Sequence, residues 1–389
     1  MTDYRLHIVS FNIPYPADYG GVIDVFYKLK ALSEAGVKIT LHAFEYGRQH
    51  ATELEKYCKR VIYYPRKTGL ASALSRLPYI VNSRRNSDLL KNLMADHAPI
   101  LFEGLHCCYY LSDRHLKNRI KLVRAHNIEH LYYSGLAKNA ASPLKKLYFN
   151  SEARKLQKFE EILADADYIL TLSTTEQEYF SKNFGKEKTK LIPLFFDNSQ
   201  FDSKLATAER CFKIQNSKLS VPYVLYQGDL STPENRMAAE FLIKSAAAED
   251  RSIHWIFAGK NPPKPLTKLA AKYKNVEIQA NVSDETMLSL ISGAVANILY
   301  TSQISGVKIK LLNALYYGGH CIVNPEMVEG SGLGEFCRIT SGKPQEFLSE
   351  IRTCLDNQMS EDEQIKRREA IGKIYNNESN ALKIKEMLK

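Results

Sequence analysis

The first half of the chain alternates short apolar runs with longer stretches of helical periodicity. The run RLHIVSF at 5–11 predicts a strand, and apolar residues recurring every three or four positions over 22–35 predict a helix. Gly36 stands where a helix C-terminus needs a left-handed residue. Further strands are expected at 37–44, 61–64, 100–102, 121–124 and 168–172, and a long helix at 143–163. This alternation predicts a parallel sheet covered by helices on both faces.

A polar stretch without periodicity, 197–220, is followed by a second alternating series. Its strands are expected at 223–227, 254–258, 276–279, 296–300 and 321–324, and its helices at 235–248, 283–292 and 307–317. We therefore expect an α/β protein of two doubly wound domains. They comprise an N-terminal domain at 1–200, a C-terminal domain at 219–365 and a charged C-terminal helix at 366–389 that packs back on the N-terminal domain.

Composition narrows the class of protein. The chain has 389 residues, 44% of them hydrophobic and 25% charged, which excludes a disordered chain and a small disulfide scaffold. No apolar run approaches the roughly 18 residues that span a bilayer. The seven cysteines form no Cys-x-x-Cys pair, so we expect reduced thiols and a cytoplasmic location. The net charge of +10 predicts a polyanionic partner: nucleic acid, an anionic membrane surface or a phosphorylated ligand.

Open parallel sheets bind ligands beyond the carboxyl ends of their strands, so the loops that follow each strand carry the candidate chemistry. The first such loop ends in Gly20 and Gly21, which open a helix. Backbone N–H groups there can approach a phosphate closely, although an ordinary tight turn explains the same pattern. The loop lacks the Gly-x-Gly-x-x-Gly fingerprint, which disfavours a nicotinamide cofactor.

The segment 301–319 also runs from strand through loop to helix. Lys308 and Lys310 fall in the first turns of that helix, where the helix dipole disfavours cations. A bound diphosphate would remove the conflict, and the alternative is a pair of solvated lysines.

This segment resembles the C-terminal signature of the GT-B glycosyltransferases, most closely the bacterial group 1 enzymes of surface glycan synthesis. Their pattern is Glu-Gly, a spacer with lysines, then Leu-Leu-Glu-Ala. Ser305 and Asn313 stand where the family has its two glutamates, which contact the donor sugar and the nucleotide ribose. Asn313 would hydrogen-bond a ribose hydroxyl more weakly than a carboxylate. The matching residues are Gly306, Lys308, Lys310, Leu311 and Leu312.

Three further segments carry the same resemblance: the strand end at 226–236, the strand end at 257–263, and the Arg-x-His-Asn-x-Glu-His stretch at 124–130. The resemblance implies two Rossmann-like domains facing a central cleft, and sugar transfer from a nucleotide sugar to a glycan or lipid-linked acceptor with retention of configuration. No cofactor is implied. The donor-binding residues it implies are Gly20, Gly21, Gly228, Arg236, Lys260, Val282, Ser305, Gly306, Lys308, Lys310 and Asn313.

Catalytic roles are expected at the N-terminal domain. His126, Asp18 and Glu129 are the candidate catalytic residues, and an inverting reaction would need a base such as His126, Asp18 or Asp24. We expect no metal, because His126 and His130 do not form the His-Glu-x-x-His order of a zinc site. The candidate acceptor-binding residues are Glu103, His106, Arg124 and Asn127.

The segment 56–91 carries nine basic residues against the single acid Asp88. Apolar residues interleave with them, which predicts docking on an anionic inner-membrane surface. The alternative is a solvated pair of helices covering the sheet. The apolar residues in question are Leu70, Leu74, Leu77, Tyr79, Ile80 and Val81.

Three other functions stay open. A nucleotide-sugar epimerase would use the same fold without an acceptor. A catalytically inactive GT-B-like binding subunit would account for the absence of both glutamates. Nucleic-acid binding rests on charge alone and lacks a helix-turn-helix, RRM or zinc-finger pattern, so no nucleic-acid partner is expected.

Overall fold

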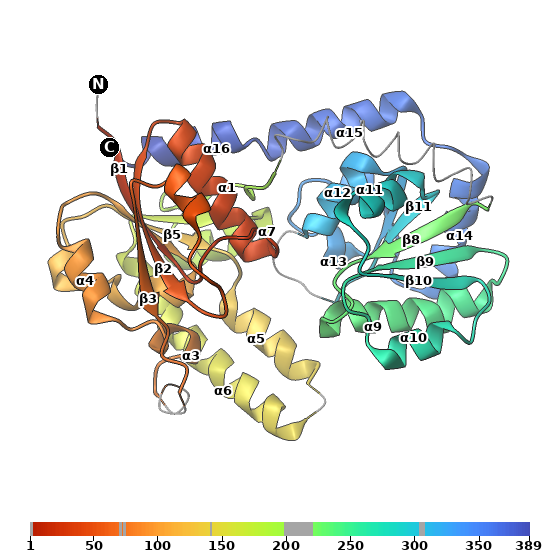
Figure 1. Cartoon of the computed structure of the whole chain (residues 1–389), viewed down its shortest axis with the longest axis horizontal. Helices are drawn as coiled ribbons and strands as arrows, with labels where there is room; N and C mark the ends of the chain where they lie inside the picture. Colours follow the sequence, from red (N-terminus) through yellow and green to blue (C-terminus); the bar gives the residue numbers. More distant parts are fainter. Residues whose placement is uncertain (1–2, 70–71, 73–74, 141, 198–220, 303–307) are drawn as a thin grey trace. The chain divides into compact units, whose positions relative to one another are not determined.

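The computed structural model describes residues 3–69, 72, 75–140, 142–197, 221–302 and 308–389 (Figure 1). The chain divides into two compact units. The first comprises Met1–Phe196 together with Tyr375–Lys389, and the second comprises Asp197–Ile374. Each unit is built around its own parallel sheet.

The sheet of the first unit has seven strands in the described part of the chain, in the order β3-β2-β1-β4-β5-β6-β7, and all neighbours are parallel. Its central strands are buried on both faces, which explains why they are continuous apolar runs in the sequence. The strands are β1 (Arg5–Ser10), β2 (Lys38–Glu45), β3 (Arg60–Pro65), β4 (Ile100–Glu103), β5 (Lys121–Ala125), β6 (Tyr168–Thr171) and β7 (Thr189–Leu191).

Helices pack against this sheet and close its core. Helix α1 follows β1 directly and buries Val22, Val25 and Leu29. Helix α16 packs beside α1, and Lys385 Nζ donates to the carbonyl of Ala35 at 2.6 Å (Figure 1). The helices of this unit are α1 (Gly20–Glu34), α3 (Tyr79–Asn82), α4 (Ser87–Leu93), α5 (Glu129–Lys138), α6 (Pro143–Phe159), α7 (Thr174–Phe184) and α16 (Asn377–Glu386), with 3₁₀ turns at Thr52–Lys56, Leu105–Tyr110, Arg114–Leu116 and Glu160–Asp165.

The sheet of the second unit has six described strands in the order β10-β9-β8-β11-β12-β13, again all parallel. The strands are β8 (Tyr223–Gln227), β9 (His254–Gly259), β10 (Val276–Ala280), β11 (Ala296–Leu299), β12 (His320–Val323) and β13 (Arg338–Ile339). The helices are α9 (Pro233–Leu242), α10 (Lys264–Ala270), α11 (Asp284–Gly293), α12 (Ile309–Tyr317), α13 (Pro325–Val328), α14 (Pro344–Asp356) and α15 (Glu361–Ile374), with a π-helical turn at Ile243–Ala247 and a 3₁₀ turn at Gly334–Phe336.

Both sheets place their first strand beside their fourth, so the strand order reverses between β1 and β4 and between β8 and β11. In doubly wound sheets the ligand crevice opens at the carboxyl ends of the strands at this reversal. The prediction of two doubly wound Rossmann-like domains is therefore confirmed, and the strand order marks where each unit is expected to bind.

Two expectations differ from the structure. The helix expected at 366–389 is broken at Asn376, whose side chain caps α16, so α15 belongs to the second unit and α16 to the first. Strands β7 and β13 were not predicted, because three and two residues are too few to show periodicity. The polar stretch 197–220 lies outside the described residues except at Asp197.

The interpretation of 56–91 as an amphipathic docking surface is not supported by its described side chains. Ile80 and Val81 are buried in the core of the first unit, and Leu77 and Tyr79 are half-buried. Leu70 and Leu74 lie outside the described residues. In the described part of the chain, no helix is both long enough and apolar enough to cross a bilayer.

Candidate functional site

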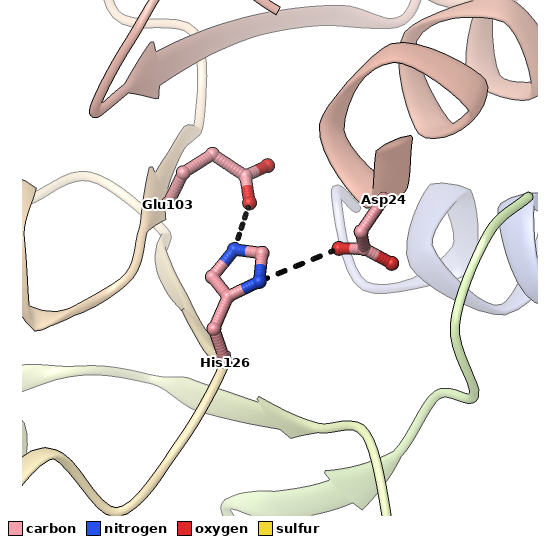
Figure 2. A group of neighbouring side chains, drawn as sticks. All are labelled: Asp24, Glu103 and His126. Atoms are coloured by element: carbon pink, nitrogen blue, oxygen red, sulfur yellow. Dashed lines mark hydrogen bonds and ion pairs between the residues drawn. The ribbon is translucent and has the colours of Figure 1, made fainter. Parts of the chain in front are cut away.

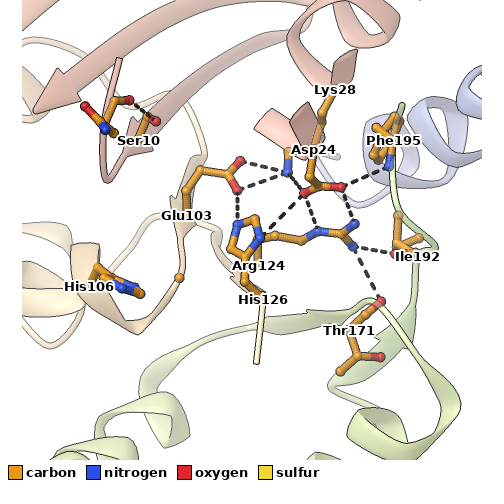
Figure 3. Close-up of polar contacts among 12 residues, drawn as sticks. Ser10, Asp24, Lys28, Glu103, His106, Arg124, His126, Thr171, Ile192 and Phe195 are labelled. Atoms are coloured by element: carbon orange, nitrogen blue, oxygen red, sulfur yellow. Dashed lines mark hydrogen bonds and ion pairs between the residues drawn. The ribbon is translucent and has the colours of Figure 1, made fainter. Parts of the chain in front are cut away.

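Five charged or titratable side chains gather near the carboxyl edge of the first sheet, where the strand order reverses between β1 and β4 (Figure 3). Asp24 and Lys28 come from the first turns of α1, Glu103 ends β4, Arg124 lies in β5, and His126 follows β5. All five are buried, and His126, at 8% exposure, is the only one with measurable contact with solvent.

Asp24 and Arg124 form a bidentate ion pair inside this cluster. The Arg124 guanidinium donates from Nε to Asp24 Oδ2 at 2.9 Å and from Nη2 to Oδ1 at 2.7 Å. The backbone N–H of Phe195 donates to Asp24 Oδ1 at 2.9 Å. Burial by itself would raise the pKa of Asp24, but Arg124 and Lys28 outweigh it and hold that pKa well below its ordinary value.

The structure differs from the expectation that Arg124 contacts the acceptor. Besides Asp24, its guanidinium donates to the backbone carbonyls of Thr171, Ile192 and Pro193, so all five N–H groups have partners. The side chain is fully buried. Arg124 therefore joins β5, β6 and the segment after β7, and it has no donor left for a substrate.

His126 is held between the two carboxylates of the cluster (Figure 2). Its Nε2 lies 3.0 Å from Glu103 Oε2, and its Nδ1 lies 4.0 Å from Asp24 Oδ2. Burial would raise the pKa of Glu103, but Lys28 and His126 lower it below its usual value, so Glu103 is ionised and accepts a hydrogen bond from Nε2–H. In the neutral tautomer that donates from Nε2, the lone pair is on Nδ1, which lies too far from Asp24 for a hydrogen bond.

Glu103 itself is fully buried, which differs from its expected contact with the acceptor. Lys28 Nζ lies 2.9 Å from Glu103 Oε1 and 2.8 Å from Asp24 Oδ2, so one ammonium bridges both carboxylates. Glu103 orients His126, in the way that a carboxylate orients the histidine of a catalytic triad.

Asp24, Glu103 and His126 offer ligand atoms within 4.8 Å of one another, a spacing that could hold a metal ion. The donor set does not fit one, because the Lys28 ammonium and the Arg124 guanidinium already neutralise both carboxylates at hydrogen-bond distance. We therefore assign no metal to this cluster.

The structure disfavours two of the three candidate catalytic bases, Asp24 and Asp18. Asp24 has a lowered pKa and is saturated with ion pairs, so it is a poor proton acceptor. Asp18 is exposed and forms an ion pair with Arg48, whose guanidinium also bonds the carbonyl of Pro16. His126 is the candidate that remains.

A second group of polar atoms lies beside His126. His106 Nδ1 and Glu129 Oε1 are 3.8 Å apart and buried, and neither has a hydrogen-bond partner among the described residues. Burial raises the pKa of Glu129 to about 8, although a hydrogen bond with Asn127 opposes the shift. Burial and then the Arg84 charge hold the pKa of His106 well below its ordinary value. At neutral pH both groups are therefore largely uncharged, and each leaves one buried polar atom without a hydrogen-bond partner among the described residues.

Gly104 makes this arrangement possible. Its φ is +72°, in the left-handed region, and a Cβ there would lie 2.8 Å from His106 Nδ1 and 3.6 Å from His126 Cδ2. Only glycine lets the chain turn between β4 and the 3₁₀ turn that carries His106.

The glycines at the start of α1 are placed as expected, at the carboxyl end of β1. Gly20 is the first residue of α1 and has open space around it. A Cβ at Gly21 would lie 2.8 Å from Phe11 Cζ, so this glycine makes room for the Phe11 ring. That ring packs against His106 and His126, with centroids 5.5 and 5.4 Å away.

In the second unit, polar groups lie near the carboxyl edge of the sheet, where the strand order reverses between β8 and β11. Lys310, in the first turn of α12, donates from Nζ to Asn235 Oδ1 at 2.9 Å, and Gln227 Nε2 donates to the Lys310 carbonyl at 3.2 Å. Gly228 lies directly below Asn235, because a Cβ at Gly228 would be 2.9 Å from Asn235 Nδ2. A Cβ at Gly259 would lie 1.7 Å from the Gly228 carbonyl, so the two strand ends meet backbone to backbone.

Lys310 is the most perturbed cation of this region. Burial, reinforced by the Lys308 charge, lowers the pKa of Lys310 to about 8. Asn313 follows one turn later on α12 and is half-buried, so it shares a helix side with Lys310. Lys308 precedes the first residue of α12. Ser305 and Gly306 lie outside the described residues.

The other expected donor contacts line the same edge. Arg236 is half-exposed in the first turn of α9 and lies 3.8 Å from Glu240. Lys260 is exposed just after β9, and Val282 is half-buried after β10. Asn281 has a φ of +53° and accepts from Asn261 N–H at 2.8 Å, which ties the loops after β9 and β10 together.

Sequence reasoning missed two residues that organise these sites. Lys28 could have been recognised from the sequence, because it stands four residues after Asp24 on a helix side that is otherwise apolar. Asn235 lies in the strand-end segment 226–236 named above, but its bond to Lys310 joins residues 75 positions apart. No local pattern encodes that contact.

No family model matches the chain. It is 28% identical over 341 residues to an uncharacterized 44.6 kDa protein in the cps region of Klebsiella pneumoniae, covering 85% of this chain and 78% of that protein.

Solved structures match nearly the whole chain. Anabaena Alr3699/HepE in complex with UDP-glucose has a TM-score of 0.64 at 14% identity, covering 98% of this chain and 99% of that one. A glycosyltransferase from Rickettsia africae has a TM-score of 0.65 at 16% identity and covers 100% of both chains. The N-terminal domain of Candida albicans trehalose-6-phosphate phosphatase has a TM-score of 0.66 at 12% identity, covering 100% and 97%. These likenesses establish the fold.

Proposed function

From the GT-B fold that the whole chain adopts, we propose that it is a glycosyltransferase that uses a nucleotide-sugar donor. The observation that carries this proposal is the full-length likeness to a structure in complex with UDP-glucose. We further propose a glycan or lipid-linked acceptor in surface glycan synthesis, supported by the relative in a cps region.

In this proposal the second unit binds the donor nucleotide. Negative charge develops on the leaving diphosphate, and cations positioned in advance stabilise it most effectively. Lys310 is suited to that task because Asn235 holds its ammonium in place. Arg236 and the backbone around Gly228 add donors at the same sheet edge, and Asn313 is left to bond a ribose hydroxyl.

The first unit supplies the groups for the sugar and the acceptor. In a retaining reaction the leaving phosphate takes the proton of the acceptor hydroxyl, and His126 Nδ1 accepts a hydrogen bond from a sugar hydroxyl. His106 and Glu129, with their buried orphaned atoms, would bind further hydroxyls. Asn127 fixes the Glu129 carboxyl by hydrogen bonding.

Thermal unfolding in the presence of nucleotides tests the proposal. UDP, GDP, ADP, dTDP and CMP would be compared, followed by the sugar conjugates of the one that binds. A ligand at about 100 times its Kd adds about 2.7 kcal/mol of stability, so a single nucleotide should raise the midpoint clearly. Absence of a shift with every nucleotide and conjugate would contradict the proposal and favour an inactive subunit. Interconversion of the free nucleotide sugar without an acceptor would identify an epimerase.

The affinity for UDP should fall as pH rises through the pKa of Lys310. Below pH 8 the ammonium is charged and attracts the diphosphate, and above pH 8 it is increasingly neutral. Isothermal titration should therefore give a Kd about tenfold weaker at pH 9 than at pH 7. Lys310→Arg should bind with little pH dependence over this range, because arginine stays charged. An unchanged pH profile in this variant would rule out Lys310 as the titrating group.

A further inference from the structure

The hairpin of α5 and α6 exposes large apolar side chains to solvent. Leu144 is 79% exposed and Leu147 is 70% exposed, the two highest values for any large hydrophobic residue in the described ranges. Tyr148 beside them is 39% exposed. Exposed apolar side chains that cluster in this way mark interaction sites rather than ordinary surface.

The helical register of α6 explains why these side chains point outward. Phe149, Ala153 and Leu156 follow one another at helical spacing and form the inward side. Phe149 packs edge-to-face on Tyr133 of α5, with ring centroids 6.1 Å apart. Leu144 and Leu147 fall on the opposite side of the helix. The two helices of the hairpin therefore pack against each other (Figure 1). Leu144 and Leu147 stay exposed outside that interface.

The charge near the tip of the hairpin is of one sign. Residues 131–151 contain three lysines and no acidic residue. Lys138 ends α5, and Lys145 and Lys146 lie in the first turn of α6, all three exposed. Within the part of the chain that the structure describes, none of them forms an ion pair. A surface that combines leucines, a tyrosine and unpaired lysines is complementary to an anionic lipid surface, where acyl chains and charged headgroups lie side by side.

We propose that the tip of this hairpin, formed by Lys138 and Leu144–Tyr148, docks on a lipid bilayer that contains anionic lipids. Leu144 and Leu147 enter the boundary between headgroups and acyl chains, and the lysines bind the headgroups. Stable attachment to a membrane surface takes two weak signals, and this tip provides both an apolar and a basic one. The proposal does not depend on the reaction that the protein catalyses, but it would bring the first unit to a lipid-linked acceptor.

Vesicle co-sedimentation of the full-length chain tests the proposal. Vesicles of phosphatidylcholine alone would be compared with vesicles that also contain phosphatidylglycerol, and binding is expected only to the second kind. Leu144→Ser with Leu147→Ser should weaken that binding at least about tenfold, because two leucines lose their burial in lipid. Lys145→Gln with Lys146→Gln should weaken it roughly tenfold. Leu355→Ser is the matched control, since Leu355 is a 41% exposed leucine of the second unit.

The substituted side chains are already exposed, so the thermal midpoint should not change, and a loss of binding cannot come from misfolding. Absence of wild-type binding, or equal binding by the leucine variant, would overturn the proposal. So would sedimentation equilibrium that shows self-association of the wild type and its loss in the leucine variant, because a second copy would then be the occupant. The nucleotide measurements above are independent of this outcome.

Discussion

Replacement of His126 by alanine should lower kcat by about 10²- to 10⁴-fold, the range that a single positioned acid, base or hydrogen-bonding group contributes. The physical reason is the geometry at the end of β5. Glu103 orients the ring through Nε2, and in the proposed reaction Nδ1 accepts a hydrogen bond from a sugar hydroxyl. Initial rates with the nucleotide sugar identified by thermal unfolding would measure the effect.

The control is His115→Ala. His115 also belongs to the first unit, but it is exposed and hydrogen-bonds only the neighbouring Asp113 in the contacts described. That variant should keep wild-type turnover. A His126→Ala enzyme with near-normal turnover and an intact thermal midpoint would remove His126 from the mechanism.

Glu103→Gln separates positioning from direct contact. Glutamine keeps the shape of the side chain but offers a neutral amide to Nε2, so the tautomer of His126 is no longer fixed. We expect kcat to fall while KM for the donor stays nearly constant, together with a changed pH profile. A purely structural role for Glu103 would lower the thermal midpoint without changing the pH profile.

Replacement of Lys28 by methionine should lower the free energy of unfolding by roughly 3–5 kcal/mol, the cost of removing one partner from a buried ion pair. Lys28 is fully buried and bridges Asp24 and Glu103, so its loss leaves two carboxylates with too little positive charge. For a unit of this size the midpoint should fall by roughly 6–20 °C. Calorimetry would measure both quantities.

Lys38→Met is the matched control, because Lys38 pairs with Asp3 on the surface, where the two side chains are 58% and 40% exposed. Its midpoint should stay close to that of the wild type. The pH dependence gives a second test. The pKa values of Asp24 and Glu103 are lowered in the folded state, so their stabilisation is present above the unfolded values of 3.8 and 4.5 and is lost as pH falls. The difference in free energy of unfolding between wild type and Lys28→Met should therefore become smaller below about pH 4. A difference that does not depend on pH would contradict the electrostatic explanation.

Local periodicity was sufficient to predict most elements of this fold. The strand predicted at 223–227 coincides with β8, and those at 5–11, 100–102 and 121–124 differ from β1, β4 and β5 by one residue at an end. Central strands of a parallel sheet are buried on both faces, so each is a continuous apolar run that can be recognised without its neighbours. The structure also places polar clusters at the carboxyl edges of both sheets, where the strand order of a doubly wound sheet puts the ligand crevice.

The roles of individual side chains depended on contacts between distant residues. Arg124 stands in a stretch that resembles a substrate-binding motif. Its donors are nevertheless all taken by Asp24, a hundred positions earlier, and by carbonyls at the end of β6 and after β7. Glu103 was expected to contact the acceptor, yet it orients His126. The pKa values of Glu129 and Lys310 likewise arise from burial, which no window of sequence specifies.

The same distinction applies to the surface of the first unit. The chain pattern at 56–91 combines basic and apolar residues, but Ile80 and Val81 pack into the core once the sheet has formed. The pattern at 143–148 is less conspicuous in the sequence, and only the packing of Phe149 on α5 leaves Leu144 and Leu147 exposed. By itself the sequence determined the strands, the helices, the two-domain class and the sheet edges that carry the polar groups, because these follow from periodicity over a few residues. The tertiary structure decided which polar groups are saturated, which keep a free atom and which apolar side chains stay in water, because those properties depend on neighbours far away along the chain.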